Sequence, residues 1–256
     1  MLRMALELRA PLELAAALAA LPLLRLAPRG DGHPVLVLPG LAAGDLSTIV
    51  IRRFLTARGY RAHAWEQGLN LGARPGVLEA CVARVRQLRA EHGQRVSLVG
   101  WSLGGVYARE IAKMLPEEVR VVVTLGAPFS GGPEATNAWR LYQLISGDRE
   151  IDAARYAALK LRPGVPTTSI FSRSDGVVAW QCSQEEEGES SENIEVHASH
   201  MGMGANPMAL YAIADRLAQP EGRWRRFDHA GHRGVKKLLF RDPRRAPGFA
   251  SLFGLY

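Results

Sequence analysis

The sequence is poor in cysteine, with only Cys81 and Cys182 in 256 residues. Two widely separated cysteines do not make the disulfide framework that stabilises small secreted domains. Cys81 lies in a helical pattern and is expected to be a small buried apolar residue. The low cysteine content therefore favours a reducing compartment, and we expect a cytoplasmic protein.

Long uncharged apolar runs are also missing. The longest one near the N-terminus, Leu14 to Leu24, is interrupted by Pro22 and is shorter than the ~20 residues of a membrane span. Four charged residues close to this run suit neither a secretory leader nor a transmembrane helix: Arg3, Glu7, Arg9 and Glu13. We therefore expect residues 1–32 to form an amphipathic helical segment that packs on the domain. Peripheral contact with a membrane through the termini is the alternative.

Nucleic-acid binding lacks support, because the sequence has no recognition motif and no aromatic residues interleaved with its basic ones. The net charge is +7, and it is unevenly placed. Residues 223–256 hold nine Lys or Arg and two Asp or Glu, which gives about +7 there and leaves the body near neutral. These residues are expected to form a basic C-terminal tail, either solvated or docked on anionic lipid or a partner chain.

The chain shows an alternation of apolar runs and helical patterns, which predicts βαβ units and a parallel sheet. The predicted strands are Val35–Leu38, Tyr60–Ala64, Val96–Val99, Val119–Leu125, Thr167–Phe171 and Ile194–His197. The predicted helices are Leu46–Ala57, Gly76–His92, Leu103–Leu115 and Pro207–Leu217. Right-handed crossovers place such helices on both faces of the sheet. The length then favours a single α/β domain over residues 1–222, with a sheet of about six strands.

One stretch breaks the alternation. Between Ser130 and Val165 the sequence has no strand pattern, only a Gly/Pro opening followed by a helical pattern with many apolar residues. We expect a short helical lid over residues 131–165, and an ordinary helical pair packed on the sheet is the alternative. The acidic run at residues 185–189 is expected to be a solvated loop.

The most informative motif is Gly100-Trp101-Ser102-Leu103-Gly104. An apolar strand precedes it and a helical segment follows, so the serine lies at the apex of a sharp turn. Such a turn holds a serine in a strained conformation and exposes its hydroxyl. The flanking glycines are required because side chains there would collide as the helix folds back on the strand. This pattern is typical of a nucleophile elbow.

A serine hydroxyl needs a base to remove its proton, and the base needs an orienting acid. With this elbow, the acid and then the histidine follow the serine in the chain. The acid candidate is Asp175, just past a predicted strand and followed by Gly176. A turn or N-cap role is its alternative, since Asp-Gly is a common turn pair. Asp148 and Asp152 are rivals by order, but they lie in the predicted lid.

The base candidate is His200, which follows the last predicted strand and precedes a helix that Asn206 could cap. Its rival is His197, placed on the predicted strand itself and therefore expected to be structural. The histidines that precede the serine break the required order: His33, His63 and His92. Those of the basic tail, His229 and His232, have no supporting context.

Acyl transfer also needs an oxyanion hole, in which fixed backbone N–H groups stabilise the charged tetrahedral intermediate. One donor is expected at Leu103, at a helix N-terminus. The second is expected at Leu41, where Gly40 lets the backbone approach the substrate; a plain strand-to-helix loop is the alternative. Trp101 is expected beside the substrate. Asn70, on a second Gly-rich loop, could orient substrate or cap a turn, and the sequence does not choose between these roles.

Together these residues resemble the bacterial α/β-hydrolases of the lipase and esterase type, over roughly Pro34 to Trp224. Five motifs in the required order carry the resemblance: Val35–Gly40, Gly100–Gly105, Thr124–Phe129, Ser174–Val178 and Ser199–Gly204. The resemblance implies an α/β-hydrolase fold with a short helical lid and a triad of Ser102, His200 and Asp175. Pro39 occupies a place where such lipases often have histidine, which weakens the case for fat hydrolysis.

The leading functional hypothesis is therefore a serine hydrolase that cleaves small-molecule carboxylic esters through an acyl-enzyme. The sequence indicates no metal and no cofactor. An acyltransferase or thioesterase with the same triad is the alternative, because the two differ only in which acceptor reaches the acyl-enzyme. A non-catalytic ligand-binding protein that keeps the fold is a further one. Acyl length and oligomeric state stay open.

Overall fold

Six parallel strands form the centre of the molecule in the computed structural model, which describes residues 6–130, 153–228 and 240. They are β1 (Pro34–Leu38), β2 (Arg61–Ala64), β3 (Val96–Trp101), β4 (Val119–Leu125), β5 (Thr167–Phe171) and β6 (Ser191–Glu195). Their order in the sheet is β2-β1-β3-β4-β5-β6, and every neighbouring pair is parallel. The predicted parallel α/β architecture is confirmed.

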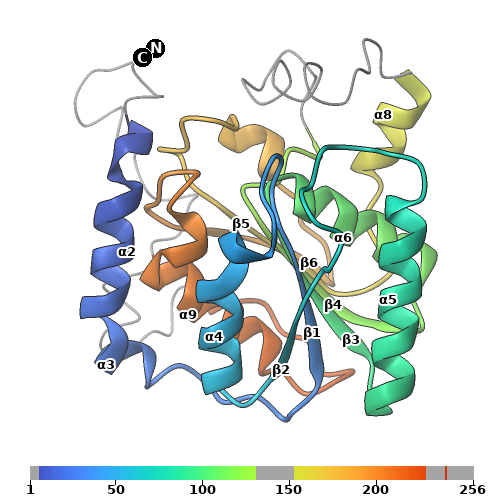
Figure 1. The fold of residues 1–256 in the computed structure, drawn as a ribbon, viewed down its shortest axis with the longest axis horizontal. Coiled ribbons are helices and arrows are strands. Elements are labelled where there is room, and N and C mark those ends of the chain that lie inside the picture. Colours follow the sequence, from blue (N-terminus) through green and yellow to red (C-terminus); the bar gives the residue numbers. More distant parts are fainter. Residues whose placement is uncertain (1–5, 131–152, 229–239, 241–256) are drawn as a thin grey trace.

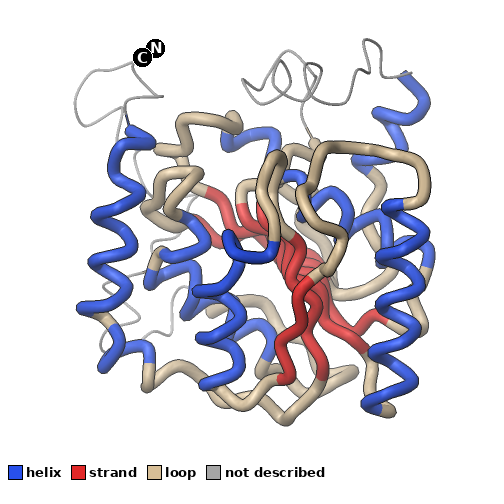
Figure 2. Tube along the Cα trace, in the orientation of Figure 1, coloured by secondary structure: helices blue, strands red, loops and turns tan. Residues whose placement is uncertain are grey.

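Helices cover both faces of this sheet (Figures 1 and 2). They are α2 (Ala10–Ala19), α3 (Leu21–Leu24), α4 (Ile49–Ala57), α5 (Val77–His92), α6 (Leu103–Met114), α8 (Ala153–Lys160) and α9 (Pro207–Leu217). Short 3-10 turns are η1 (Leu6–Arg9), η2 (Asp45–Thr48), η4 (Trp180–Ser183) and η5 (Met203–Ala205). The predicted helix Leu46–Ala57 is therefore regular only from Ile49, because its first turn is the 3-10 turn η2.

The core lies in two layers, one on each side of the sheet. Alternate residues of β1 enter opposite layers, since successive strand side chains point to opposite faces. Val35 and Val37 pack with α4 and α9, whereas Leu36 and Leu38 pack with α5 and α6. Burial of β1 on both faces explains its continuous apolar run.

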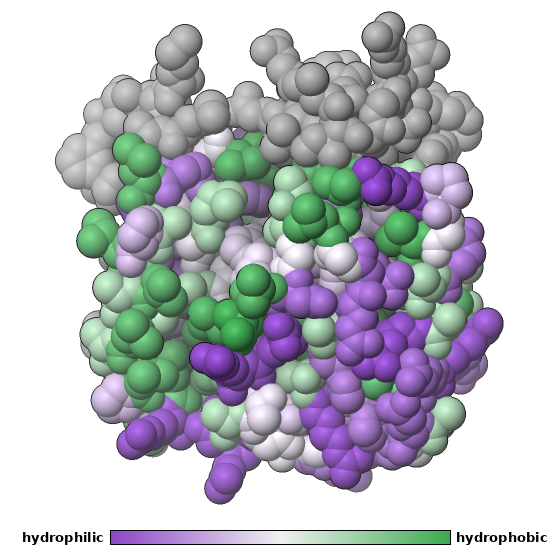
Figure 3. Space-filling model, viewed as in Figure 1, coloured by the Kyte–Doolittle hydropathy of each residue, from purple (hydrophilic) through white to green (hydrophobic). Residues whose placement is uncertain are grey.

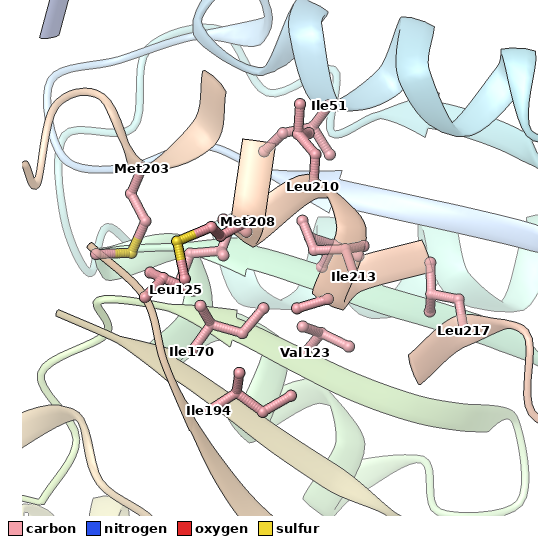
Figure 4. Packing of buried hydrophobic residues seen from close by; sticks show 14 of the residues in the cluster. Ile51, Val123, Leu125, Ile170, Ile194, Met203, Met208, Leu210, Ile213 and Leu217 are labelled. Atoms are coloured by element: carbon pink, nitrogen blue, oxygen red, sulfur yellow. The ribbon is translucent and has the colours of Figure 1, made fainter. Parts of the chain in front are cut away.

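Helix α9 shows how the first layer is built (Figure 4). Ile213 lies over the strand residue Val123, whereas Leu210 meets Ile51 of α4, and all four are at most 2% exposed. The helix begins as the sequence predicts, with Asn206 accepting hydrogen bonds from the first-turn N–H groups and proline next. A fixed start for α9 also fixes the end of the loop that precedes it, which carries His200.

The strand order reverses at β1. The chain passes from β1 to β2 on one side, and then crosses to β3 on the other side of β1. The loops that follow β1 and β3 therefore diverge at the carboxyl ends of these strands, the place at which open α/β sheets generally bind ligands. The predicted oxyanion loop follows β1 and the predicted nucleophile follows β3.

Strand β6 differs from its prediction, since it begins at Ser191 and ends at Glu195 rather than running over Ile194–His197. Its polar side chains are buried and paired: Glu192 binds Arg216 at 2.8 Å, and Asn193 exchanges two hydrogen bonds with a loop backbone. Hydrophobic patterning cannot reveal a strand whose buried side chains are polar. His197 lies outside the strand and is exposed.

The N-terminal segment is helical, as predicted, but its leucines face outward. Leu8, Leu12 and Leu18 are 81%, 71% and 62% exposed, whereas Leu24 of α3 is buried. Figure 3 shows hydrophobic surface gathered on the α2 side of the molecule. Within the described residues, no helix is both long enough and apolar enough to span a membrane.

The predicted lid falls mostly outside the described residues, which omit 131–152. The helix α8 follows the omitted stretch, and Arg109 of α6 donates to backbone carbonyls at its C-terminal end. Arg109 also forms a fully buried ion pair with Glu185. The prediction that the whole acidic run is solvated is therefore wrong at Glu185, whose charge is buried because a buried arginine pairs with it.

The predicted basic tail is described only in part, at residues 223–228 and 240. Phe227 and Phe240 are buried against each other, with ring centroids 4.9 Å apart, and Phe240 also contacts Tyr211 of α9. At these two positions the segment packs on the domain rather than extending into solvent.

Candidate active site

Ser102 lies at the end of β3 with φ +53° and ψ −123°, a conformation that is costly for a residue with a side chain. A Cβ on Gly100 would collide with the backbone of Gly104, and a Cβ on Gly104 would collide with the Leu38 carbonyl. The Ser102 N–H donates to the Leu125 carbonyl at 2.8 Å. Close strand–helix contact and this hydrogen bond hold the serine in its strained turn.

The structure brings the three residues of the predicted triad together. His200 Nε2 is 3.0 Å from Ser102 Oγ, and His200 Nδ1 is 2.7 Å from Asp175 Oδ2. All three side chains are buried: Ser102 is 7% exposed, and Asp175 and His200 are each 4% exposed. Both distances are within the range in which a base can take a proton and an acid can orient that base.

Asp175 is fixed by its own loop, residues 172–178, which we call the acid loop. Its Oδ1 accepts hydrogen bonds from the N–H groups of Val177 and Val178 at 2.8 and 2.7 Å, which leaves Oδ2 for His200. Gly126 closes on the pair from β4: with φ +54°, its missing Cβ would lie 3.1 Å from Asp175 Oδ2 and 3.2 Å from His200 Nδ1. Any larger residue would press on the hydrogen bond.

The electrostatics of His200 follow from its partners. Burial works against the charged imidazolium, but the negative charge of Asp175, the hydrogen bond to it, and the negative charge of Glu7 outweigh burial and raise the pKa of His200. An imidazole with a raised pKa accepts a proton readily, which suits a general base. The Glu7 contribution was not foreseen.

The predicted oxyanion loop lies directly against the serine. A Cβ on Gly40 would be 3.2 Å from Ser102 Cβ, so only glycine leaves the space open. Among the described residues, the N–H groups of Leu41 and Leu103 donate to no acceptor. Leu103 is the first residue of α6, where the helix dipole favours negative charge.

Asn70 holds the predicted oxyanion loop through hydrogen bonds to its backbone. Its Nδ2 donates to the Pro39 carbonyl at 2.8 Å, and its backbone carbonyl accepts from the Ala42 N–H at 2.7 Å. The Gly72 N–H donates to its Oδ1 at 3.3 Å. Asn70 is 1% exposed, so these contacts favour the turn-capping alternative over a direct contact with substrate.

Trp101 is 9% exposed and reaches toward the loop of the predicted base, residues 196–202, which we call the base loop. Its Nε1 donates to the His200 carbonyl at 3.1 Å, and its ring lies where a Cβ of Gly204 would be. The predicted substrate contact stays a prediction, and the observed contacts add a role in holding His200.

Sequence reasoning missed two residues of this site, Glu7 and Glu13. Both come from the N-terminal segment and accept hydrogen bonds from backbone groups of the base loop. Their partners are more than 180 residues away in sequence, so no local pattern could have identified them. The available signal was weak: two acidic residues within a leucine-rich helical segment.

Of the rival residues, only His197 is described, and it is not part of this arrangement. The side chain of His197 is exposed, and Asp148 and Asp152 lie outside the described residues. In the part of the chain that the structure describes, no group of three His, Cys, Asp or Glu side chains could hold a metal ion. The groups that the structure brings together at Ser102 are the serine hydroxyl, the His200 imidazole, the Asp175 carboxylate and nearby backbone N–H donors.

Comparisons with known proteins support the fold. No family model and no curated sequence matches the chain. Among solved structures, it is similar to Aspergillus fumigatus lipase B (18% identity over 74% of this chain, TM-score 0.54). It is also similar to a pyrethroid hydrolase from Sphingobium faniae JZ-2 (19%, 74%, 0.54) and to an α/β superfamily hydrolase from Oenococcus oeni PSU-1 (20%, 73%, 0.51).

The extent of these matches differs. The chain covers 99% of the pyrethroid hydrolase and 91% of the Oenococcus oeni hydrolase, but only 53% of lipase B. It thus spans about half the length of that lipase. At such low identity the likeness establishes the fold, and this chain has the α/β-hydrolase fold that its sequence predicted.

Proposed function

We propose that the protein is a serine hydrolase that cleaves carboxylic esters. The proposal rests on one observation. Ser102 Oγ lies 3.0 Å from His200 Nε2, His200 Nδ1 lies 2.7 Å from Asp175 Oδ2, and Ser102 itself is in a strained turn. The names of the similar structures, a lipase and a pyrethroid hydrolase, agree with an ester substrate.

In the proposed mechanism, Ser102 Oγ attacks the ester carbonyl carbon while His200 Nε2 takes the hydroxyl proton. The carbon–oxygen bond to the alcohol then breaks, and His200 gives its proton to the departing alcohol. A water, deprotonated by His200, attacks the acyl-enzyme and releases the carboxylic acid and the serine. Asp175 holds the imidazole tautomer and stabilises the imidazolium.

The oxyanion of each tetrahedral intermediate is assigned to the N–H groups of Leu41 and Leu103. Both are without an acceptor among the described residues, and a glycine at position 40 keeps the space beside Ser102 open. Two fixed donors in a site that excludes water stabilise developing negative charge strongly. Trp101 is proposed to hold the base loop and to line the acyl site.

A panel of p-nitrophenyl esters of increasing acyl length, with a fluorophosphonate probe, tests the proposal. The wild type should turn over at least one ester and be labelled at Ser102. Ser102→Ala should lose both turnover and labelling. Turnover that persists in Ser102→Ala would contradict the mechanism. A folded wild type that neither turns over nor is labelled would favour the non-catalytic ligand-binding alternative.

The same triad supports an acyltransferase or a thioesterase. The acyl-enzyme is common to all three reactions, and the acceptor or the leaving group decides the outcome. Product analysis with added alcohol separates transfer from hydrolysis, because transfer gives a new ester instead of free acid. A parallel assay with acyl thioesters tests the thioesterase.

Peripheral membrane contact through the termini is proposed as a separate property. The outward leucines of the N-terminal segment supply apolar surface, and residues 223–256 supply positive charge. Co-sedimentation with anionic vesicles should weaken with salt and with removal of residues 223–256. Absence of binding at low salt would remove this proposal and leave the hydrolase proposal intact.

A further inference from the structure

Glu7 links the two loops that carry the acid and the base. Its Oε1 accepts hydrogen bonds from the Gly176 N–H at 2.8 Å and from the His200 N–H at 3.0 Å. Its Oε2 accepts from the Met201 N–H at 2.8 Å. One carboxylate of η1 therefore spans the acid loop and the base loop, directly behind the Asp175–His200 pair.

Glu13 of α2 binds the neighbouring residue of the base loop. Its Oε1 accepts from the Ser199 N–H at 2.6 Å, and its Oε2 accepts from the Ser199 hydroxyl at 3.1 Å. A Cβ on Gly202 would collide with the Glu13 carboxylate, so the loop is glycine where the carboxylate approaches. Burial raises the pKa of Glu13, and its hydrogen bonds to Ser199 oppose that rise.

The backbone of the base loop explains why two carboxylates lie next to it. The successive N–H groups of Ser199, His200 and Met201 all donate to carboxylate oxygens. Successive N–H groups that converge in this way form a concavity for an anion, and the N-terminal segment supplies that anion from within the chain. Without the two carboxylates these N–H groups would lose the acceptors that hold the loop at three successive residues.

We infer that Glu7 and Glu13 are positioning residues of the active site, which hold the base loop and the acid loop in the register that aligns His200 with Ser102. The inference rests on the proposed hydrolase function for its kinetic consequences. The geometry itself stands on the contacts between two carboxylates and five donors. The N-terminal segment is thus part of the site, although it follows no strand of the sheet.

The charges around the two carboxylates differ. Glu7 faces His200 and contributes, with Asp175, to the raised pKa of that imidazole. Glu13 is 3.8 Å from Arg9 of its own segment, which also donates to Ser174 of the acid loop. Glu13 is not among the groups that shift His200. Removal of either charge therefore has a distinct signature in the pH profile.

The test compares Glu7→Gln and Glu13→Gln with Glu79→Gln, a control on the exposed face of α5. We expect kcat to fall about 10- to 100-fold in the first two, because a small misplacement of a catalytic group costs up to that much. KM should change little, because both carboxylates bind backbone groups of the acid loop and the base loop rather than the ester carbonyl. The pKa that limits kcat/KM should fall in Glu7→Gln and stay in place in Glu13→Gln. Glu79→Gln should match the wild type.

Two further variants guard against misfolding as the explanation. Gly202→Ala displaces the Glu13 carboxylate without removing a charge and should lower kcat as Glu13→Gln does. Glu7→Asp keeps the charge and should retain more of the raised pKa than Glu7→Gln. Thermal unfolding identifies variants that are folded at the assay temperature, and only these are compared.

The His200 pKa is also measured by NMR titration of the imidazole, which needs no turnover. A fall of this pKa in Glu7→Gln supports the positioning contact even if no ester is cleaved, in which case only the proposed function fails. If folded Glu7→Gln and Glu13→Gln equal Glu79→Gln in kcat and in the His200 pKa, the inference is overturned and the contacts are structural only.

Discussion

Two arrays of serine, histidine and aspartate lie at opposite ends of β3. At its carboxyl end, Ser102 meets His200 at 3.0 Å and Asp175 follows at 2.7 Å. At its amino end, Ser97 Oγ lies 2.7 Å from His33 Nε2, and His33 Nδ1 lies 2.5 Å from Asp31 Oδ1. In both arrays each side chain is within hydrogen-bond distance of the next, and the rear contacts are the shorter ones. We call them the front array and the rear array.

Their surroundings differ. Ser97 is a strand residue, paired in register with Val35, fully buried and without the positive φ of Ser102. No substrate carbonyl can approach the Ser97 hydroxyl, because the residue is fully buried on its face of the sheet. Ser102 lies on a turn that follows the strand, beside the Leu41 and Leu103 N–H groups, which donate to no acceptor among the described residues. If Ser102 is the nucleophile, as we propose, then access and the backbone turn distinguish it from Ser97, because both serines have a histidine and an aspartate in line.

The charges differ as well. Burial and the charge of Arg120 lower the pKa of His33, whereas the acidic partners of His200 raise its pKa. Arg120 donates to Asp31 Oδ2 at 2.7 Å and also lies 3.0 Å from His33 Nδ1, so a positive charge stands beside the rear pair. The lowered pKa of His33 favours its neutral form, in which it links the residue before β1 to Ser97 of β3, and the raised pKa of His200 suits the general base that we propose.

The largest effect is expected from exchanging the two serines for alanine. Ser102→Ala should lower kcat/KM for the best ester by about 10⁴-fold or more, as removal of a triad nucleophile does. Ser97→Ala should leave turnover per folded molecule within about twofold, because catalysis needs access, and should lower stability by about 1 kcal/mol through one lost hydrogen bond. The measurements are ester turnover and urea unfolding. A rear variant that loses turnover while folded would break the distinction.

A smaller effect is expected from a substitution at Gly126, which packs closely against Asp175 and His200 of the front array. No glycine among the described residues packs in this way against the side chains of the rear array. Gly126→Ala would place a methyl group 3.1 Å from Asp175 Oδ2. It should reduce kcat by about 100-fold, since a small displacement of the catalytic pair suffices. Gly93→Ala is the matched control, because Gly93 also has positive φ (+67°) but no atom within 4 Å of the added Cβ. Equal loss of activity in both would show that backbone strain alone is responsible.

The sequence could predict those parts of the molecule that obey local rules. Strands β1 to β5 and the elbow are predicted from apolar runs and from glycine spacing, and the order serine, aspartate, histidine, together with a position just past a predicted strand, points to Asp175 and His200. What it could not predict depends on pairing over long distances. β6 is polar because Glu192 meets Arg216, and Glu185 is buried because it meets Arg109.

The rear array was invisible for the same reason. His33 was set aside because it precedes the serine of the elbow, and nothing in the sequence relates it to Ser97, 64 residues away. Glu7 and Glu13 were read only as charges that suit neither a leader nor a membrane span, in a segment expected to pack on the domain. In the structure the two carboxylates face the base loop and accept hydrogen bonds from its N–H groups, whereas several leucines of the segment are exposed.

A tenfold effect is expected from Asn70, the support of the oxyanion loop. Asn70→Ala removes the hydrogen bond to the Pro39 carbonyl and should lower kcat about 10-fold, less than removal of an oxyanion donor itself. KM should be nearly unchanged, because Asn70 is buried beneath the loop. Gln67→Ala, in the same Gly-rich loop, is the control and should retain kcat. A change in KM alone would instead indicate direct contact with substrate.

The smallest effect is expected on lowering the pH, to which the two histidines should respond differently: His33 through stability and His200 through turnover. His33 has a folded-state pKa below its ordinary value of 6.5, so the unfolded chain binds the proton more strongly and stability falls as the pH drops below 6.5. The slope cannot exceed about 1.4 kcal/mol per pH unit for one proton. His200, with its pKa raised above 6.5, becomes protonated first, so turnover should be lost at a higher pH than stability.

Urea unfolding at pH 7.5, 6.5 and 5.5 measures the acid limb of stability, that is, its loss as the pH falls. The value of kcat/KM at the same pH values measures the acid limb of activity. His33→Gln should reduce the acid dependence of stability and leave the activity limb where it is, because Gln cannot take up the proton. Its stability at pH 7.5 should itself be lower by about 1–3 kcal/mol, since Asp31 and Ser97 lose a buried partner. If His33→Gln moved the activity limb and not the stability limb, the rear array would be coupled to catalysis, and its assignment as a structural link would be wrong.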